Sequence, residues 1–355
     1  MNNNLFRFAT SELSQDAFIC WTANWFNDQR NPALHKMAEE FISLLSGIKE
    51  ISEVKVVRQF QKIDVLLIVN QTTAVIVEDK TFTSEHDDQI NRYEEYLKDA
   101  MTQNGYLELD GIRYVISNIV SVYLKTGALY PEDESNGNLT GIKKILRKDM
   151  LALTEKYKGY SEIVYDYWEN LDDLDKWYLG CEENYHSGQF NAAFQNSYGQ
   201  LICMKDLFQG KMFFEFSEQD IEINSASSRG RPYTWAWLWG RNDWYWLGYR
   251  LDSDSGGYCL ALKQYRNYKK SPARDVIRQQ KAAMFVEMQV YLKEHLASLP
   301  LKYVLGGNNQ SYNESTLVKF YFKDNDIILL RKYLCNLAES MLGEYLKRTP
   351  SIDLK

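Results

Sequence analysis

The sequence predicts an α/β fold in its first half, with a mixed β-sheet flanked by helices, and an α+β fold rich in aromatic strands in its second half. In the first half, helical patterns are followed by three apolar strands, a helix and a further strand, an order typical of a sheet covered by helices. Two of these strands form a hairpin, which makes the sheet mixed rather than purely parallel. In the second half, aromatic residues recur in short runs with the period of two that strands show.

The boundary between the two halves is predicted within residues 180–188, where glycines bracket the stretch with the weakest structural pattern. This gives domains of 1–185 and 186–355. A chain of 355 residues is long enough for two domains with separate cores.

The composition is that of a soluble globular protein, with 45% hydrophobic and 25% charged residues. A net charge of −7 argues against a general basic coat for nucleic acid, so such binding needs local basic patches. The five cysteines lack metal-thiolate spacing, and an odd number fits free thiols in a reducing cytoplasm. We expect a cytoplasmic chain without a membrane partner, because the sequence shows no signal peptide and no apolar run of about 20 residues.

Two helices are predicted at the N-terminal end. The first spans residues 10–26 and places Glu12 and Asp16 on one face. Spacing alone favours two solvated acids over a pair that faces a cation, since acids are common in the first turn of a helix. The second helix spans residues 31–45, with a proline in its first turn and a glycine after its end.

The predicted hairpin over residues 62–80 carries three charges where buried strands normally carry none. Side chains alternate along a strand, so Glu78 and Lys80 share a face, and a turn at 70–72 places Asp64 directly across from Glu78. Opposed residues of a hairpin have Cβ atoms about 5 Å apart. Two carboxylates that close repel each other, so one should take up a proton or both should bind a cation.

Two interpretations of these charges are open at this point. Oxygen ligands from Asp64 and Glu78 suit Mg²⁺ or Mn²⁺, with Lys80 orienting a water or meeting a phosphate. The alternative is an ordinary ion pair between Lys80 and one of the two acids at the end of a strand.

A helix predicted over residues 87–98 follows the hairpin. Gln89 and Tyr93 are four residues apart and share one face of it, although Tyr93 could equally be a core residue. The remaining elements predicted for this half are a strand over 113–125 and helices over 142–157 and 161–178.

The second half contains a predicted hairpin over residues 234–250, turning at 240–243. Trp235, Trp237 and Trp239 fall on one face of its first strand, and Trp244 and Trp246 on one face of its second. Such aromatic platforms can stack nucleic-acid bases, but a cross-strand aromatic core is the favoured interpretation. The other predicted elements are strands over 211–217, 220–224 and 316–322 and helices over 273–297 and 326–347.

One segment of this acidic chain is basic. Residues 263–281 hold seven Lys and Arg residues and a single acid, Asp275. Such a segment could follow the phosphates of a nucleic acid, but a charge run is more often a solvated face.

The charged hairpin and the helix that follows it resemble the PD-(D/E)XK nuclease superfamily. The resemblance rests on Asp64, on the run Glu78-Asp79-Lys80, and on Gln89-Ile-Asn-Arg-Tyr93. The last motif is similar to that of an exonuclease-like branch, and the sequence around Glu12 is similar to an uncharacterised bacterial group of these nucleases. The resemblance covers roughly residues 5–178.

The resemblance implies a restriction-endonuclease-like sheet of four strands and metal-dependent cleavage of phosphodiester bonds, with Mg²⁺ or Mn²⁺ as cofactor. It implies that Lys80 serves the attacking water and the phosphate. The metal ligands that it implies are Asp64, Glu78, the backbone carbonyl of Asp79 and an acid of the first helix, for which we choose Glu12 over Glu40. Gln89 and Tyr93 would hold the substrate or the lysine. Ile63 stands where the family usually has a proline.

We therefore expect a nuclease that acts on nucleic acid, with DNA preferred over RNA, in bacterial defence or repair. The alternative is a catalytically silent module of the same fold that binds nucleic acid or a protein partner. The second domain would then recognise the substrate or regulate the first. Homo-oligomerisation is left open.

Overall fold

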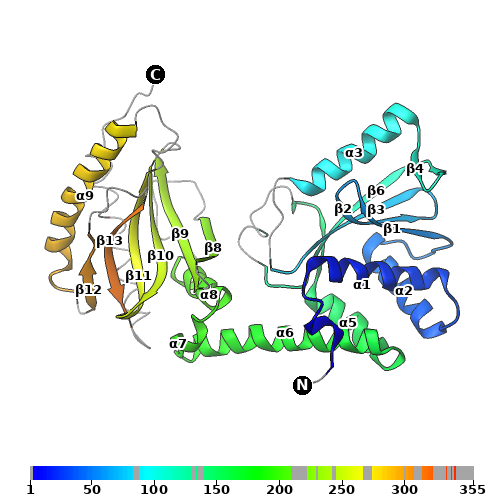
Figure 1. Cartoon of the computed structure of the whole chain (residues 1–355), viewed down its shortest axis with the longest axis horizontal. Coiled ribbons are helices and arrows are strands. Elements are labelled where there is room, and N and C mark those ends of the chain that lie inside the picture. The colour runs from blue at the N-terminus through cyan, green and yellow to red at the C-terminus, as the bar shows by residue number, and fades with distance from the viewer. Residues whose placement is uncertain are drawn as a thin grey trace. The chain divides into compact units, whose positions relative to one another are not determined.

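The computed structural model describes residues 3–82, 88–129, 133, 139–208, 222–228, 231–241, 245–266, 274–299, 301–307, 314–322, 333, 337 and 340. The chain divides into two compact units, Met1–Tyr178 and Leu179–Lys355 (Figure 1). The division falls within helix α6 (Glu162–His186), where the sequence analysis placed its least structured stretch. That expectation was wrong, because Cys181 and Tyr185 lie four residues apart and are both buried, as a helical stripe requires.

The first unit is built on a five-stranded sheet in the order β1-β2-β3-β6-β7. Its strands are β1 (Val54–Phe60), β2 (Ile63–Val69), β3 (Thr73–Lys80), β6 (Asn118–Lys125) and β7 (Lys143–Leu146). The pairs β1–β2 and β2–β3 are antiparallel, whereas β3–β6 and β6–β7 are parallel. The prediction of a mixed sheet flanked by helices is confirmed.

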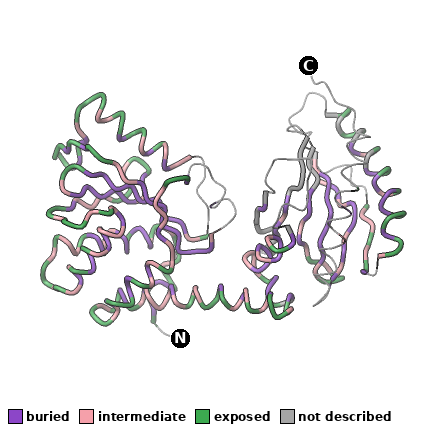
Figure 2. Tube along the Cα trace, turned by 180° about the vertical axis from the view of Figure 1, so that it is seen from behind, coloured by how far each residue is buried: buried purple, intermediate pink, exposed green. Residues whose placement is uncertain are grey.

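Helices cover both faces of this sheet (Figure 1). The helices are α1 (Glu12–Asn24), α2 (Pro32–Ser46) and α5 (Arg147–Tyr157) on one face, and α3 (Gln89–Asn104) on the other. Alternation along the strands separates two cores: the odd-numbered residues of β3, such as Val75, pack under α1 and α2, and the even-numbered ones, such as Ile76, pack under α3. Figure 2 shows that the middle of this sheet is largely buried: β3 is buried along its whole length, and β2 at every position except Asp64, which is half-buried.

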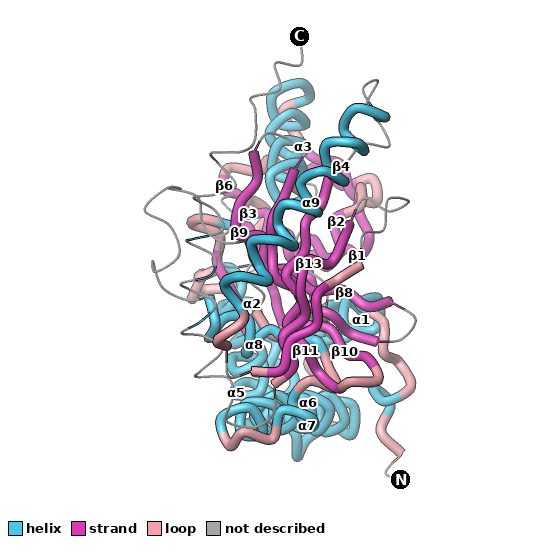
Figure 3. Tube along the Cα trace, turned by 90° about the vertical axis from the view of Figure 1, so that its left-hand side faces the viewer, coloured by secondary structure: helices cyan, strands magenta, loops and turns pink. Residues whose placement is uncertain are grey.

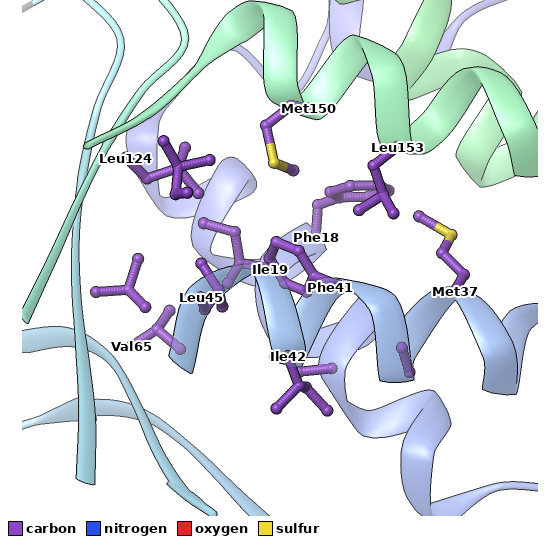
Figure 4. Close-up of a cluster of buried hydrophobic side chains, with 14 of the residues drawn as sticks. Phe18, Ile19, Met37, Phe41, Ile42, Leu45, Val65, Leu124, Met150 and Leu153 are labelled. Carbon is purple, nitrogen blue, oxygen red and sulfur yellow. The ribbon is translucent and has the colours of Figure 1, made fainter. Parts of the chain in front are cut away.

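The larger core fills the space between α1, α2, α5 and the sheet (Figure 4). The side chains that meet there include Phe18, Ile19, Phe41, Val65, Leu124 and Met150. This packing fixes α1 on the sheet, and α1 carries the acids that the sequence analysis singled out.

The predicted ends of α2 are confirmed. The side chain of Asn31 accepts hydrogen bonds from the backbone of Ala33 and Leu34, Pro32 occupies the first turn, and Gly47 closes the helix with a φ of 78°. An asparagine cap, a proline whose missing N–H costs nothing and a glycine in the left-handed region are the expected boundary signals.

Two elements of this unit differ from their prediction. The single strand expected over 113–125 is split into β5 (Ile112–Tyr114), which forms a small hairpin with β4 (Leu107–Leu109), and β6. The helix expected over 142–157 begins only at Arg147, since β7 precedes it. The four residues of β7 have too short a pattern to predict a strand, and only their pairing with β6 orders them.

The second unit contains a six-stranded antiparallel sheet in the order β12-β13-β11-β10-β9-β8 (Figure 1). Its strands are among those drawn in magenta in Figure 3. The strands are β8 (Glu222–Ser228), β9 (Arg231–Arg241), β10 (Tyr245–Asp254), β11 (Gly257–Arg266), β12 (Lys302–Leu305) and β13 (Glu314–Tyr321). Its helices are α7 (Phe190–Ala193), α8 (Ser197–Phe208) and α9 (Arg274–Leu296). The predicted hairpin, helix 273–297 and strand 316–322 correspond to β9–β10, α9 and β13, and β11 was missed. The predicted elements over 211–217 and 326–347 lie outside the described residues, apart from isolated positions of the second.

Of the basic side chains that the structure describes in the segment 263–281, two are buried and one is exposed. Lys263 lies in β11 and is 4% exposed, held between Asp252 (3.2 Å) and Glu314 (2.7 Å). Lys281 of α9 is also buried, whereas Arg278 is exposed. Of the five tryptophans of the hairpin, only the side chain of Trp235 is described, and it is half-buried.

No helix in the described ranges combines the length and the apolar character needed to span a membrane.

Candidate active site

The register of two strand pairs brings the predicted site residues together at one end of the central strands of the first sheet. We call this end of the strands the site edge. In the turn between β2 and β3, Asn70 and Gln71 adopt left-handed φ values of 51° and 62°. The antiparallel register pairs Val65 with Val77, which places Asp64 opposite Glu78, as the sequence predicts. The site therefore lies where β2 begins and β3 ends.

Strand β6 adds a second row of side chains to this edge. It runs parallel to β3, with Tyr123 beside Glu78 and Lys125 beside Lys80. Paired residues of neighbouring strands point to the same face, so these four side chains lie on the face that α3 covers. Sequence reasoning did not assign a role to Lys125, although a lysine at the end of an apolar strand is the same signal that drew attention to Lys80.

Glu78 and Lys80 form a buried ion pair. The Lys80 Nζ donates to Glu78 Oε1 at 2.5 Å, and the two residues are 5% and 0% exposed, respectively. The second oxygen of Glu78, Oε2, has no hydrogen-bond partner among the described residues. Burial, followed by the charge of Asp64, raises the pKa of Glu78 to about 7.

The pKa values of Asp64 and Lys80 are shifted by the same buried surroundings. Burial raises the pKa of Asp64, partly offset by a hydrogen bond from the backbone N–H of Asp79 at 3.2 Å. Burial acts to lower the pKa of Lys80, but the carboxylates of Glu78 and Asp64 outweigh it, and the pKa of Lys80 lies above its usual value. Lys80 is thus held as an ammonium between two acids.

Asp79 points to the opposite face of the sheet, as alternation requires. Its side chain is fully buried, and its Oδ1 accepts a hydrogen bond from Nε2 of Gln15 on α1. Burial holds the pKa of Asp79 well above its usual value. Asp79 therefore meets the site through its backbone, whose N–H donates to Asp64, and not through its side chain.

Of the two helix acids considered from the sequence, Glu12 is at this edge and Glu40 is not. Oε1 of Glu12 accepts a hydrogen bond from the backbone N–H of Thr81 at 3.4 Å, and its charge raises the pKa of Lys80. Glu40 instead binds two residues of α5, Lys156 at 3.0 Å and Tyr157 at 2.8 Å.

Asp16 corrects the expectation of two solvated acids on α1. It is 1% exposed, accepts a hydrogen bond from Gln59 at 3.1 Å, and has one oxygen, Oδ1, without a partner in the described part of the chain. Burial and then the charge of Asp64 raise the pKa of Asp16 to about 6. The end of β1 covers this helix face, which spacing within the helix could not reveal.

The Gln89 and Tyr93 pair lies on α3 beside the site. Nε2 of Gln89 donates to the hydroxyl of Tyr93 at 3.4 Å, and the Tyr93 ring packs in the core under α3. Burial, followed by the charge of Glu78, raises the pKa of Tyr93. The ring is therefore a core residue, and its hydroxyl lies within electrostatic reach of the carboxyl group.

Lys125 lies in a second buried polar group at this edge. Its Nζ is 3.4 Å from Oδ2 of Asp133, whose Oδ1 accepts a hydrogen bond from the hydroxyl of Tyr123 at 2.5 Å. Both Lys125 and Asp133 are fully buried, and burial lowers the pKa of Lys125.

The donor set fits a hard divalent cation. Asp64 and Glu78 supply carboxylate oxygens, and one Glu78 oxygen is buried and unsatisfied within the described residues. Burial raises the pKa of both acids, so their ionised forms lack compensation that a cation would supply. In the described ranges, however, no three His, Cys, Asp or Glu residues are arranged to hold a metal ion together. Lys80 occupies the position beside Glu78 instead.

Comparisons of the chain with protein-family models, with curated proteins and with solved structures found no match.

Proposed function

We propose that this protein is a metal-dependent nuclease of the PD-(D/E)XK type, which hydrolyses phosphodiester bonds, in DNA rather than RNA. The observation that carries the proposal is the convergence of Asp64, Glu78 and Lys80 on one buried strand end, with a Glu78 pKa near 7. Buried carboxyl groups with raised pKa values, next to a lysine, are typical of sites that do chemistry.

In this proposal Asp64, Glu78, the backbone carbonyl of Asp79 and Glu12 hold Mg²⁺ or Mn²⁺. The ion, when bound, lowers the pKa of a water and neutralises charge on the phosphoryl group. Among the protein's own groups, Lys80 acts on the reacting atoms: its ammonium group donates hydrogen bonds that orient the attacking water and stabilise charge on a phosphate oxygen. The existing pair with Glu78 keeps Lys80 protonated and aimed along the edge.

Gln89 and Tyr93 have a supporting role in the proposal. Their mutual hydrogen bond places a hydroxyl group and an amide on the α3 side of the site, where they can bind a phosphate oxygen or orient Lys80. A bound divalent cation would also cancel the excess negative charge of the carboxylates, which lets an acidic protein accept a polyanion.

A second candidate function is a silent module that binds nucleic acid or a protein without cleaving it. Two observations favour it: Lys80 neutralises Glu78, and the described residues form no three-ligand metal group. The C-terminal unit, predicted to recognise or regulate, would then be the binding part of a scaffold.

A cleavage assay separates the two functions. Linear, circular and single-stranded DNA and RNA are incubated with the full chain and Mg²⁺ or Mn²⁺, with and without a chelator. We expect metal-dependent cleavage that falls at least about 100-fold in Lys80→Ala, and no change in Lys98→Ala, which removes an exposed lysine paired with Glu94 on α3. Unchanged cleavage by a folded Lys80→Ala chain contradicts the nuclease; binding that ignores the chelator, without cleavage, supports the module.

A further inference from the structure

One buried side chain joins α1 to the ends of both central parallel strands. Gln15, one helical turn after Glu12, is 8% exposed. Its Oε1 accepts hydrogen bonds from Oγ1 of Thr126 at 2.9 Å and from Oγ1 of Thr81 at 3.4 Å, while its Nε2 donates to Asp79. A single amide therefore connects a helix, the end of β3 and the residue that follows β6.

These contacts lie where regular strand pairing ends. Thr81 and Thr126 directly follow Lys80 and Lys125, their hydroxyl groups are 3.1 Å apart, and the Thr126 N–H donates to the Lys80 carbonyl at 3.1 Å. The pairing of β3 with β6 ends at Lys80 and Lys125. Just past it, the Gln15 amide adds a polar link between these strand ends and α1, beside the apolar packing that holds the helix on the sheet.

Packing alone does not explain a glutamine here. The neighbouring buried residues of α1, Phe18 and Ile19, are apolar and sit in the large core. Burying an amide is costly unless its polar atoms form hydrogen bonds. Both polar atoms of the Gln15 amide form hydrogen bonds with groups at the strand ends that carry the site. The same contact gives a hydrogen-bond partner to the buried side chain of Asp79, which strand alternation turns away from Glu78 and Lys80.

Glu12 is the group whose position depends on this connection. Residues three apart on a helix share a face, and Glu12 accepts the Thr81 N–H while Gln15 accepts the Thr81 hydroxyl. A rotation or shift of α1 would break both contacts together. It would also move the carboxyl group of Glu12 away from Asp64 and Lys80, whose pKa values respond to its charge.

We propose that Gln15 is a positioning residue of the proposed metal site: through Asp79, Thr81 and Thr126 it holds α1 so that Glu12 faces Asp64 and Glu78. The inference rests on the proposed function and deepens it, because it assigns the Asp79 side chain to the helix and its backbone to the cation. Residues that orient metal ligands typically change metal affinity 10- to 100-fold when they are replaced.

The test is a double-mutant cycle in the full chain. Gln15→Met keeps the length of the side chain and removes its amide, and Asp79→Leu removes the acceptor. Mn²⁺ affinity is measured by calorimetry without DNA, and the half-saturating Mn²⁺ concentration is measured in the cleavage assay. We expect each single change to weaken Mn²⁺ binding about 10- to 100-fold, with KM for DNA unchanged at saturating Mn²⁺. The double variant should be no weaker than the worse single one, and Asp79→Asn should shift the affinity less than Asp79→Leu.

Asn4→Ala is the matched control. Asn4 is also a buried amide, 1% exposed, and its Nδ2 donates to the Asp166 carbonyl at 2.7 Å and to Glu169 at 3.0 Å, next to α6. It should lower thermal stability without changing the Mn²⁺ dependence. A Gln15→Met chain whose Mn²⁺ dependence matches that of Asn4→Ala overturns the inference alone, as does strict additivity in the cycle.

A wild-type chain that neither cleaves nor binds Mn²⁺ overturns the proposed function, and the inference with it. If Gln15→Met does not fold, Asp79→Leu and Asp79→Asn decide the question by the same comparison.

Discussion

The ammonium group of Lys80 lies 2.5 Å from Oε1 of Glu78, on the same face of β3, and both side chains are buried. The second Glu78 oxygen has no partner among the described residues. A buried pair of this kind adds little to stability compared with apolar residues of the same size. A pair that adds little stability at the end of an otherwise apolar strand is a candidate for a role in the proposed site, and the following predictions test that role.

Without metal, the protein should lose stability as the pH rises from about 4.5 to about 7. The pKa of Glu78 is 4.5 when unperturbed and about 7 in the folded chain, so in this window the unfolded chain gives up a proton that the folded chain keeps. Glu78 by itself should lower the free energy of unfolding by roughly 3 kcal/mol across the window. Thermal unfolding in chelator at pH 5 and pH 8 measures this.

Glu78→Gln provides the comparison for that measurement. The glutamine cannot titrate, so the variant should gain stability relative to wild type as the pH rises. Asp16, with a pKa of about 6, contributes in the same direction in both proteins and cancels in the difference. A difference between the two proteins that does not depend on pH would show that Glu78 titrates normally.

Metal binding should release a proton near neutral pH. A cation competes with the proton that Glu78 carries below pH 7, so the apparent Mn²⁺ affinity should drop about tenfold for each pH unit below that value. Calorimetry in two buffers with different ionisation enthalpies counts the proton. Equal heats in both buffers at pH 6.5 would contradict a protonated Glu78 at the metal site.

Gly127→Ala should push apart the backbone segments that follow β3 and β6 at the site. A Cβ at this position would lie 1.7 Å from the carbonyl oxygen of Thr81, the residue after Lys80. The strand ends must separate to admit it, which should cost about 3 kcal/mol of stability and lower cleavage. Gly159→Ala, where a Cβ meets nothing within 4 Å, is the matched control and should leave both unchanged.

Lys263→Met should destabilise the second unit rather than weaken nucleic-acid binding directly. Lys263 is buried between Asp252 and Glu314, and its loss leaves these two acids with Arg250 as their basic partner among the described residues. We expect a loss on the order of 3 kcal/mol in urea unfolding. The exposed Arg278→Met should change stability by less than about 0.5 kcal/mol.

One outcome would contradict the structural role predicted for Lys263. If Lys263→Met keeps its stability and loses affinity for DNA with a reduced salt dependence, the lysine contacts phosphate after all.

The sequence by itself determined the hairpin and what it carries. Strand alternation and a short polar turn place Asp64 across from Glu78, with Lys80 on the same face, because these relations depend only on residues close together in the chain. The caps of α2 follow for the same reason, since Asn31 and Gly47 act on the helix next to them.

The tertiary structure alone decided which distant groups join that hairpin. It buried Asp16, brought Glu12 to the edge and bound Gln15 to the ends of β3 and β6. It also placed Lys125 beside Lys80 through a parallel pairing. These relations require segments far apart in the sequence to pack together, so the burial and charge of each group depend on partners that no local pattern contains.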